Sequence, residues 1–417
     1  MNEMKFSGEE WIGDIPTHWD LTPIGSVFKQ RNEKVSDKEF EPLSVTMQGV
    51  VPQLESAAKS NDSDNRKKIT IGDFVINSRS DRRGSFGVSD LEGSCSVINT
   101  VLMPMLPGDA HYYYYAFQTT LFPDEFYRWG NGIVADLWST KWDNMRKILL
   151  PNPPEDERKA IAFFLDEKCK KIDALIDNER ILIADLEKYK QSLISEHVIG
   201  AGYPDTVYKD DCFWMPQMPS HWDTAYSKRL FALRKEKARE EDEQLTASQK
   251  HGIIPQRLFV EKEGRQVVQV EKGEDILKHV EAGDFVISMR SFQGGLEYSE
   301  TCGKISSAYV MLYPRDKSQI FNDYYKWLFK SDYYIKALQS TSDLVRDGQA
   351  LRYSNFAKIY LPYPPYEEQQ QIGEYLNNKC ARIKTLTEQS EQLISMLLDY
   401  KKALIYEYVT GKKEVPN

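Results

Sequence analysis

Apolar residues follow a seven-residue period through residues 151–200. After its opening prolines this stretch holds no Gly or Pro before Gly200, so nothing interrupts a helix of roughly 40 residues. Seven of the nine a and d positions are apolar when Leu165 is taken as position a. The nine positions are Leu165, Lys168, Ile172, Leu175, Glu179, Leu182, Leu186, Tyr189 and Leu193. The pattern predicts a long helix that packs against a second helix.

The same series returns 211 residues later, within residues 362–411. Its members are Leu376, Lys379, Ile383, Leu386, Ser390, Leu393, Leu397, Tyr400 and Leu404. We therefore expect the two helices to pair with each other as a coiled coil. Because each helix follows its own globular block, an antiparallel pairing is favoured. From Leu165 to Leu193 such a seam would span roughly 40 Å at about 1.5 Å per residue.

The duplication extends into the blocks that precede the helices. The opening WIGDIPTHWD at 11–20 returns as WMPQMPSHWD at 214–223, and GDFVI at 72–76 returns at 283–287. The offset changes from 203 to 211 residues, so one insertion lies between the two motifs, where loops absorb added residues. We expect an α+β fold with an internal pseudo-two-fold repeat: blocks at 1–150 and 201–361, long helices at 151–200 and 362–411, and a tail at 412–417.

An arginine follows the GDFVI strand in both copies. These residues are Arg79 and Arg290, and a polar loop containing glycine comes after each. A stiff strand that ends this way can present the guanidinium to guanine in a major groove, where a bidentate pair contributes about 1 to 3 kcal/mol of discrimination. The alternative is a structural salt bridge to Asp73 or Asp284.

Composition and charge limit the possible functions. A chain of 417 residues with 41% hydrophobic residues has room for two or more packed domains, and its net charge of -9 argues against a general polyanion binder. Any contact with nucleic acid would use local patches. No run approaches the roughly 18 apolar residues of a membrane span, and the start lacks the apolar core of a signal peptide, so we expect a cytoplasmic protein. The five cysteines are scattered without a CxxC, which favours reduced thiols over a zinc site or disulfides.

Taken in order, three duplicated features resemble the DNA-specificity subunit of type I restriction-modification systems: the twin openings, the twin GDFVI segments with Arg79 and Arg290, and the twin segments that begin LPNPPEDERK and LPYPPYEEQQ. The resemblance covers essentially the whole chain. It implies two target-recognition domains, each reading one half of a split, asymmetric site on double-stranded DNA, with the paired helices setting the gap. It also implies a subunit without catalysis of its own, which docks adenine-methyltransferase (modification) subunits and, through the complex, motor-nuclease (restriction) subunits. S-adenosylmethionine, ATP and Mg are then expected on those partners and no cofactor or metal on this chain.

Candidate DNA-binding residues are polar side chains in the loops that differ between the copies. Arg82 and Arg83 suit phosphates, and Gln293, which replaces them in the second copy, suits adenine. A solvated charge run or a loop tip is the alternative for most of the set. The first copy supplies Gln48, Asn65, Arg66, Lys67, Arg79, Ser80, Arg82, Arg83, Ser85 and Lys141. The second supplies Gln249, Arg290, Ser291, Gln293, Arg346, Gln349 and Arg352.

The apolar a and d residues of the two helices form the candidate partner-binding set. They are Leu165, Ile172, Leu175, Leu182, Leu186, Tyr189 and Leu193 on the first helix, and Leu376, Ile383, Leu386, Leu393, Leu397, Tyr400 and Leu404 on the second. The outer faces of the helices could dock other proteins, with a solvated face as the alternative. A coiled-coil adaptor that binds proteins without reading DNA is the rival function, and the acidic charge favours it.

No catalytic motif emerges from the sequence. Asn152-Pro153-Pro154 resembles the tetrapeptide with which amino-methyltransferases hold a flipped base, but Glu155 stands where that chemistry needs an aromatic ring. There is also no glycine-rich turn for a methyl donor, so we expect a non-enzyme. The tyrosines at 112–115 could stack on bases, although a helix packed into a core explains them better.

Overall fold

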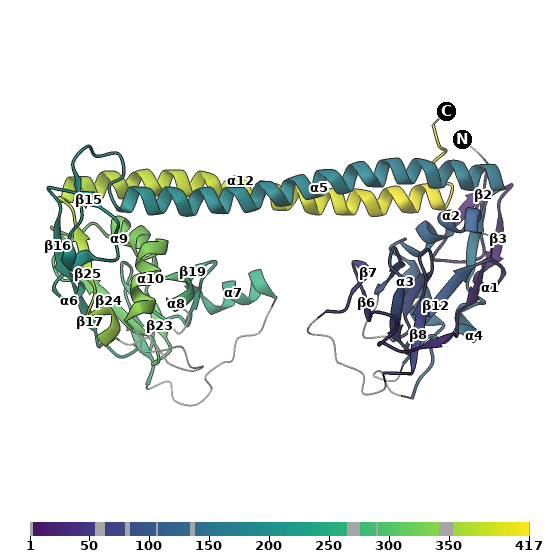
Figure 1. The fold of residues 1–417 in the computed structure, drawn as a ribbon, viewed down its shortest axis with the longest axis horizontal. Helices are drawn as coiled ribbons and strands as arrows, with labels where there is room; N and C mark the ends of the chain where they lie inside the picture. Colours follow the sequence, from purple (N-terminus) through teal and green to yellow (C-terminus); the bar gives the residue numbers. More distant parts are fainter. Residues whose placement is uncertain are drawn as a thin grey trace. The chain divides into compact units, whose positions relative to one another are not determined.

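A computed structural model describes residues 3–54, 63–79, 84–105, 107–133, 138–264, 276–288, 291–341 and 353–416. The chain divides into two compact units, which we call unit 1 (residues 1–179 and 391–417) and unit 2 (residues 180–390). Two long helices, α5 (Glu155–Val198) and α12 (Tyr366–Val409), each contribute one part to unit 1 and the other to unit 2. The α+β block before α5 is called head 1, and the block before α12 is called head 2 (Figure 1).

Each head is built from short strands and a few helices. Head 1 contains β1 (Met4–Phe6), β2 (Asp14–Pro16), β3 (Asp20–Pro23), α1 (Ile24–Val27), β4 (Phe28–Gln30), β5 (Lys34–Val35), β6 (Leu43–Thr46), β7 (Gly49–Pro52), β8 (Arg66–Ile69), β9 (Phe74–Asn77), β10 (Phe86–Val88), β11 (Gly93–Ser96), β12 (Asn99–Pro104), α2 (Pro107–Phe117), α3 (Phe122–Arg128), α4 (Trp142–Met145) and β13 (Leu149–Asn152). Head 2 contains β14 (Thr206–Val207), the 3-10 helix η3 (Asp210–Cys212), β15 (Met218–Pro219), β16 (Asp223–Tyr226), α6 (Ser227–Leu230), β17 (Phe231–Arg234), β18 (Leu245–Ser248), β19 (Gly252–Pro255), α7 (Gln256–Glu263), β20 (Lys278–Val280), β21 (Phe285–Ile287), α8 (Ser291–Gly294), β22 (Glu297–Tyr298), β23 (Gly303–Ile305), β24 (Val310–Pro314), α9 (Asn322–Leu328), α10 (Asp332–Ser340), α11 (Tyr353–Phe356) and β25 (Tyr360–Tyr363).

The central sheets of the two heads have the same strand order. Head 1 runs β4-β12-β9-β10 and head 2 runs β17-β24-β21-β22, with antiparallel neighbours throughout. The duplicated GDFVI motif forms β9 and β21, a strand of the central pair in each sheet. This agreement confirms the expected α+β fold with an internal repeat.

The GDFVI strand is apolar throughout because both of its faces are covered. Phe74 and Ile76 belong to the large core of head 1, whereas Val75 belongs to a smaller cluster on the opposite face. Phe285 and Val286 divide between two cores of head 2 in the same way. Alternate side chains of a strand point to opposite faces, so a run without polar residues is the expected signature of such a strand.

Helix α2 packs its tyrosines into the core of head 1. Tyr112, Tyr113, Tyr114 and Tyr115 are all buried, and their hydroxyl groups find partners inside the unit. Tyr113 donates to Asn152 Oδ1 over 2.6 Å, and Tyr115 donates to Asp166 Oδ1 over 2.7 Å. The core interpretation of residues 112–115 is confirmed, and base stacking by these rings is excluded.

The two long helices pair antiparallel inside each unit. In unit 1 the start of α5, including Leu165 and Ile172, packs in one cluster with Leu404 and Tyr408 near the end of α12. Lys401 Nζ lies 2.7 Å from a carboxylate oxygen of Asp173 across this pair. In unit 2 the order is reversed, because the end of α5 packs on the start of α12 in the cluster that holds Leu193, Ile194, Val198, Leu376, Cys380 and Ile383. The expected antiparallel pairing is thereby confirmed.

The seam differs from the expected a and d pattern. The a positions Leu165, Ile172, Leu193, Leu376, Ile383 and Leu404 are buried, and Leu186 and Leu397 pack partly against the same cores. The d positions Leu175, Leu182, Tyr189, Leu386, Leu393 and Tyr400 are 42–57% exposed. Residues at e positions, such as Cys169, Ile176 and Cys380, are buried instead. The helices carry three apolar rows, and one neighbouring helix covers only two of them.

Each long helix begins later than the sequence boundaries at 151 and 362. Pro151 and Asn152 extend β13, which pairs with β3, and Pro362 and Tyr363 extend β25, which pairs with β16. Helix α5 then starts at Glu155 and α12 at Tyr366. Proline lacks an N–H but tolerates extended backbone, so these residues end an edge strand before the helix begins.

A duplicated polar contact fixes the start of each helix to its own head. Glu157 accepts hydrogen bonds from Trp19 Nε1 and from His18 Nε2, both over 2.8 Å. Glu368 is bound in the same way by Trp222 and His221. The two HWD motifs recognised in the sequence therefore serve to anchor the long helices.

A second duplicated contact fixes the end of each helix. Tyr112 donates its hydroxyl to the carbonyl of Val409, the last residue of α12, over 2.7 Å. In unit 2 Tyr324 donates to the carbonyl of Val198, the last residue of α5, over 2.9 Å. Each unit thus joins the head of one sequence repeat to the helix end of the other repeat.

Candidate nucleic-acid interface

A partly buried arginine, different from the predicted one, neutralises the aspartate of each GDFVI motif. Arg31 binds both carboxylate oxygens of Asp73, with Nε 2.8 Å from Oδ2 and Nη2 3.0 Å from Oδ1. The backbone N–H of Thr70 also donates to Asp73. Arg234 binds Asp284 equivalently over 2.6 and 3.0 Å. Hydrogen bonding to Asp73 raises the pKa of Arg31.

These contacts bear on the salt bridge to Asp73 that the sequence left open for Arg79. Asp73 is already saturated by Arg31 and Thr70, so it is not held by Arg79. The side chain of Arg79 is exposed at the end of β9, and its backbone N–H donates to Asn77 Oδ1 over 3.0 Å. Its backbone also bridges to Ser139. Arg79 therefore has a fixed backbone and an exposed guanidinium, as a base reader requires. Arg290, its counterpart, lies outside the described residues.

A pocket of about 490 Å³ brings several candidate residues of head 1 together. Arg79, Lys67 and Lys141 line it, and the amide of Gln30 lines it from the end of β4. Its remaining lining includes the hydroxyl pair of Ser78 and Thr100, whose oxygens lie 2.9 Å apart. The lining also includes Trp142 and the carboxylate-bearing Asp143. A concave site with three cationic side chains and several hydrogen-bonding groups suits a nucleic-acid backbone and its base edges.

Lys67 enters this pocket from strand β8. Its ammonium group donates to the carbonyl of Asn99 over 2.6 Å. The residue is half-buried, and burial lowers its pKa. An ammonium group has three donors, so its capacity for further partners exceeds this one bond.

The other candidate DNA-binding residues of head 1 lie in places that are less suitable for contact with DNA. Arg66 is buried, and its Nε donates to Ser94 Oγ over 2.8 Å, so we assign it a structural role. Ser85 is also buried, and Asn65 is half-buried. Gln48 is exposed in the turn between β6 and β7. Ser80, Arg82 and Arg83 lie outside the described residues.

In head 2 the side chain of one predicted glutamine lies against the short helix that carries the other. Gln249 is exposed in the turn between β18 and β19, and its side-chain amide lies against Gly294 of α8, where an added Cβ would stand 2.9 Å from Nε2. Gln293, the neighbour of Gly294, is exposed on the same short helix. Ser291 is buried at the start of α8, where its Oγ accepts the backbone N–H of Ser288. Arg346, Gln349 and Arg352 lie outside the described residues.

One glutamine and one lysine illustrate what the sequence argument missed. Gln30 was not predicted, because nothing in its local pattern marks the end of β4 as a pocket wall. Lys278 of β20 was also not predicted, although the offset of 211 residues that relates the two GDFVI motifs maps it onto Lys67. Its ammonium group donates to the carbonyl of Tyr309 over 2.7 Å, in the same way as Lys67 donates to Asn99. The repeat could have identified Lys278.

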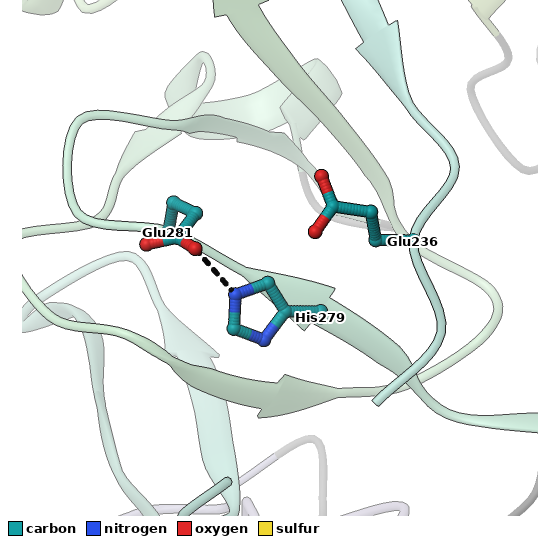
Figure 2. A group of neighbouring side chains, drawn as sticks. All are labelled: Glu236, His279 and Glu281. Carbon is teal, nitrogen blue, oxygen red and sulfur yellow. Dashed lines mark hydrogen bonds and ion pairs between the residues drawn. The ribbon is translucent and has the colours of Figure 1, made fainter. Parts of the chain in front are cut away.

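A histidine and two glutamates lie near one another in head 2 (Figure 2). Among the described residues, the ligand-capable atoms of Glu236, His279 and Glu281 lie within 4.8 Å of one another, a spacing that could hold a metal ion. Cationic groups already occupy them, however. Arg239 Nη2 lies 3.1 Å from both glutamates, and His279 is 2.9 Å from Glu281.

The cluster favours the protonated form of His279. Its Nδ1 lies 2.7 Å from Asp242, so both ring nitrogens face carboxylates. Burial opposes protonation, but the hydrogen bonds with Asp242 and Glu281 outweigh it and raise the pKa of His279. Hydrogen bonding to His279 and Cys302 lowers the pKa of Glu281 to about 2. His279 also occupies the sequence position that Lys68 holds in head 1, where Lys68 pairs with Glu33 over 3.1 Å. We therefore assign the cluster a structural role rather than a metal-binding one.

The long helices carry exposed apolar residues that form a candidate protein-binding surface apart from the heads. The exposed d residues, which we call the d row, are Leu175, Leu393 and Tyr400 in unit 1 and Leu182, Tyr189 and Leu386 in unit 2. The repeat offset of 211 residues relates them in pairs, such as Tyr189 with Tyr400. Exposed apolar side chains in a regular row on a helix are typical of a protein-binding face. No described helix is long and apolar enough to cross a bilayer.

The two α+β heads share one strand order, and the first carries an exposed arginine at a strand end beside a cationic pocket. A protein-family model described as "Type I restriction modification DNA specificity domain" matches residues 230–395, which cover most of head 2 and the first part of α12. Residues 230–395 thus match a type I DNA-specificity domain, and the resemblance noted in the sequence is confirmed.

Two solved structures align with nearly the whole chain, and the first of them supports the fold. One, from a study titled "Structural basis underlying complex assembly and conformational transition of the type I R-M system", matches with a TM-score of 0.62 and 16% identity, covering 96% of this chain and 99% of the other. The HsdS subunit from Thermoanaerobacter tengcongensis matches with a TM-score of 0.48 and 15% identity, covering 96% and 98%. At these identities the likeness concerns the fold alone.

Proposed function

We propose that each head reads one half of a bipartite, asymmetric site on double-stranded DNA and that α5 and α12 set the gap between the halves. The observation that carries this proposal is the DNA-specificity family match over head 2 combined with the identical strand order in head 1. The exposed Arg79 and its cationic pocket supply the chemistry in head 1, because Arg can bond bidentately to guanine. Loops differ between the heads, so the two half-sites differ.

Mapping of methylated adenines tests this proposal. The chain is expressed with its modification subunits in a host that lacks the system, and methylated positions are read across the genome. We expect one split sequence to be methylated. Arg79→Ala should relax or abolish recognition of one half-site and preserve the other, whereas Lys5→Ala, at an exposed position of β1, should change neither. Methylation without sequence preference, or none with intact partners, would favour a protein adaptor instead.

We also propose that the d row docks the modification subunits. Six apolar side chains, 42–57% exposed and repeated on both helices, are left uncovered by the helix pair, three of them in each unit. An apolar helix face of a partner would bury it, in the way that amphipathic helices fill apolar grooves. Docking on both helices would place modification subunits on equivalent surfaces of the repeat.

Copurification tests the docking proposal. Tyr189→Glu combined with Tyr400→Glu places two charges in the d row and should abolish capture of the modification subunits by the tagged chain. Lys384→Glu, at an exposed position outside the d row, is the matched control and should leave capture unchanged. Equal capture by both variants would exclude the d row as the docking surface.

We propose further that catalysis and its cofactors reside in the partners. Glu157 and its equivalent Glu368 are each bound by a histidine and a tryptophan, so both serve as helix anchors. S-adenosylmethionine, ATP and Mg would bind the modification and restriction subunits. Calorimetry should detect S-adenosylmethionine binding to the complex and none to the isolated chain.

A further inference from the structure

Both heads place two lysines directly opposite each other on neighbouring strands. In head 1 Lys34 of β5 pairs with Lys67 of β8. In head 2 Lys237 forms an antiparallel bridge with Lys278 of β20. Residues paired in this way lie on the same face, with Cβ atoms about 4.5 to 5.5 Å apart. The two pairs also correspond in sequence, at the offsets of 203 and 211 residues that relate the repeats.

Like charges directly opposite each other destabilise a sheet. Carboxylates do not compensate these pairs, since no ion pair joins any of the four lysines to an acidic group in the described part of the chain. Lys34 and Lys237 are exposed, whereas Lys67 and Lys278 are half-buried. The fold therefore maintains an unfavourable arrangement in both heads, although the surrounding loops differ.

The half-buried lysine of each pair is held in a fixed position. Lys67 donates to the carbonyl of Asn99 and Lys278 to the carbonyl of Tyr309, and these carbonyls are also equivalent between the heads. Burial lowers the pKa of both lysines, so each ammonium group lacks part of the solvation that it would have in water. In head 1 the held ammonium lines the same pocket as Arg79.

We propose that Lys34 with Lys67, and Lys237 with Lys278, are matched clamps for phosphates of the DNA backbone, one clamp in each head. An anion between two ammonium groups removes their mutual repulsion and restores the lost solvation of the inner one. A phosphate contact carries no base information, which explains why the clamps are kept in two heads whose loops differ. This inference rests on the proposed reading of DNA by each head.

The salt dependence of DNA binding tests the clamps. The full chain in complex with its modification subunits is titrated with a DNA that carries its mapped site and with an unrelated DNA, over a range of salt concentrations. Each phosphate contact that is lost should reduce the slope of log K against log salt by about 0.9, which at 0.1 M salt weakens binding by about 8-fold. Lys34→Gln, Lys67→Gln, Lys237→Gln and Lys278→Gln should each weaken both DNAs by the same factor and leave the site preference unchanged.

Controls separate the clamp from a structural role. Lys5→Gln in unit 1 and Lys317→Gln in unit 2 remove exposed lysines outside the clamps and should keep the slope of the native complex. Lys34→Gln and Lys237→Gln should also raise the urea midpoint of the free chain, because they relieve the like-charge contact. Lys67→Arg should restore most of the slope that Lys67→Gln loses.

Three outcomes overturn the proposal. An unchanged slope in all four glutamine variants would leave Lys67 and Lys278 as holders of backbone carbonyls only. A change confined to one half-site would make the lysines base readers. Equal slope loss in the Lys5 and Lys317 controls would show a general charge effect. If the native complex itself shows no preference for any site, the proposed function fails, and that result is separate from the behaviour of the lysine variants.

Discussion

Substitution of Gly411 tests how tightly the end of α12 is fitted to head 1. Gly411 has a φ of 70°, in the left-handed region that side chains rarely adopt. A Cβ at this position would stand 2.4 Å from Pro16 Cδ and 2.9 Å from Trp19 Cη2. Both neighbours are buried, so neither can move aside freely. Gly411→Ala therefore lowers the free energy of unfolding in two ways, through backbone strain and through steric overlap.

The two costs can be separated by a second glycine. A left-handed conformation costs a non-glycine residue about 1 to 2 kcal/mol. Overpacking adds about 1 to 3 kcal/mol, so we expect Gly411→Ala to lower the free energy of unfolding by about 2 to 5 kcal/mol. Gly8 has a φ of 89°, and an added Cβ there would meet no atom within 4 Å, so Gly8→Ala should show the backbone cost alone. Gly200→Ala is the matched change in unit 2, where a Cβ would lie 2.5 Å from Pro219 Cγ.

Urea unfolding followed by tryptophan fluorescence measures these differences, since Trp19 and Trp222 lie at the two sites. Hydrogen exchange should show faster exchange around β3 and the end of α12 for Gly411→Ala, and around β16 and the end of α5 for Gly200→Ala. If Gly411→Ala and Gly8→Ala cost the same within about 0.5 kcal/mol, the close fit of the helix end to head 1 would be refuted.

Three further predictions address other parts of the chain. The pKa of His279 is raised in the folded chain, so the stability that its protonated form contributes is complete below about pH 6.5 and is lost as the pH rises through the folded pKa. The urea midpoint of the native chain should therefore fall over that pH range, and the midpoint of His279→Gln should not. Tyr112→Phe leaves the carbonyl of Val409 without its buried donor and should cost about 1 kcal/mol or more in the same unfolding assay, whereas no loss would mean that water replaces the hydroxyl. Insertion of one heptad after both Leu186 and Leu397 lengthens each helix by about 10 Å, or about three base pairs of DNA, so the methylated site should have a longer gap; an unchanged gap would exclude the helices as its determinant.

The duplication made the architecture predictable from the sequence. Two ordered copies of the HWD, GDFVI and proline-helix segments fixed the number of heads, the long helices and their pairing partner. The two alternatives for Tyr112 could also be weighed correctly, because four aromatic residues in succession seldom remain exposed. Local patterns of this kind are sufficient to predict the secondary structure when each segment has one low-energy structure.

The seam and the site were less predictable, because they depend on contacts distant in sequence. A heptad pattern identifies apolar rows, but it does not say which two of three rows face the partner helix, so Leu175 and Tyr189 were placed in the seam and lie exposed. Arg66 was treated as a DNA contact, yet its burial depends on Ser94 of a neighbouring strand. The pairing of Lys34 with Lys67 likewise depends on strand register, which the sequence does not reveal.

The bond from Tyr112 to Val409 joins residues that are 297 positions apart in the chain. At about 5 to 20 residues per second, a ribosome needs roughly 15 to 60 s to make the intervening polypeptide. Head 1 is synthesised first, but its contact with Val409 cannot form until the end of α12 has been made. In head 2, by contrast, Val198 is already synthesised when Tyr324 is added, so that contact can form at once. Although the heads share one fold, the first to be translated should be the last to mature, and it should depend more on chaperones during synthesis.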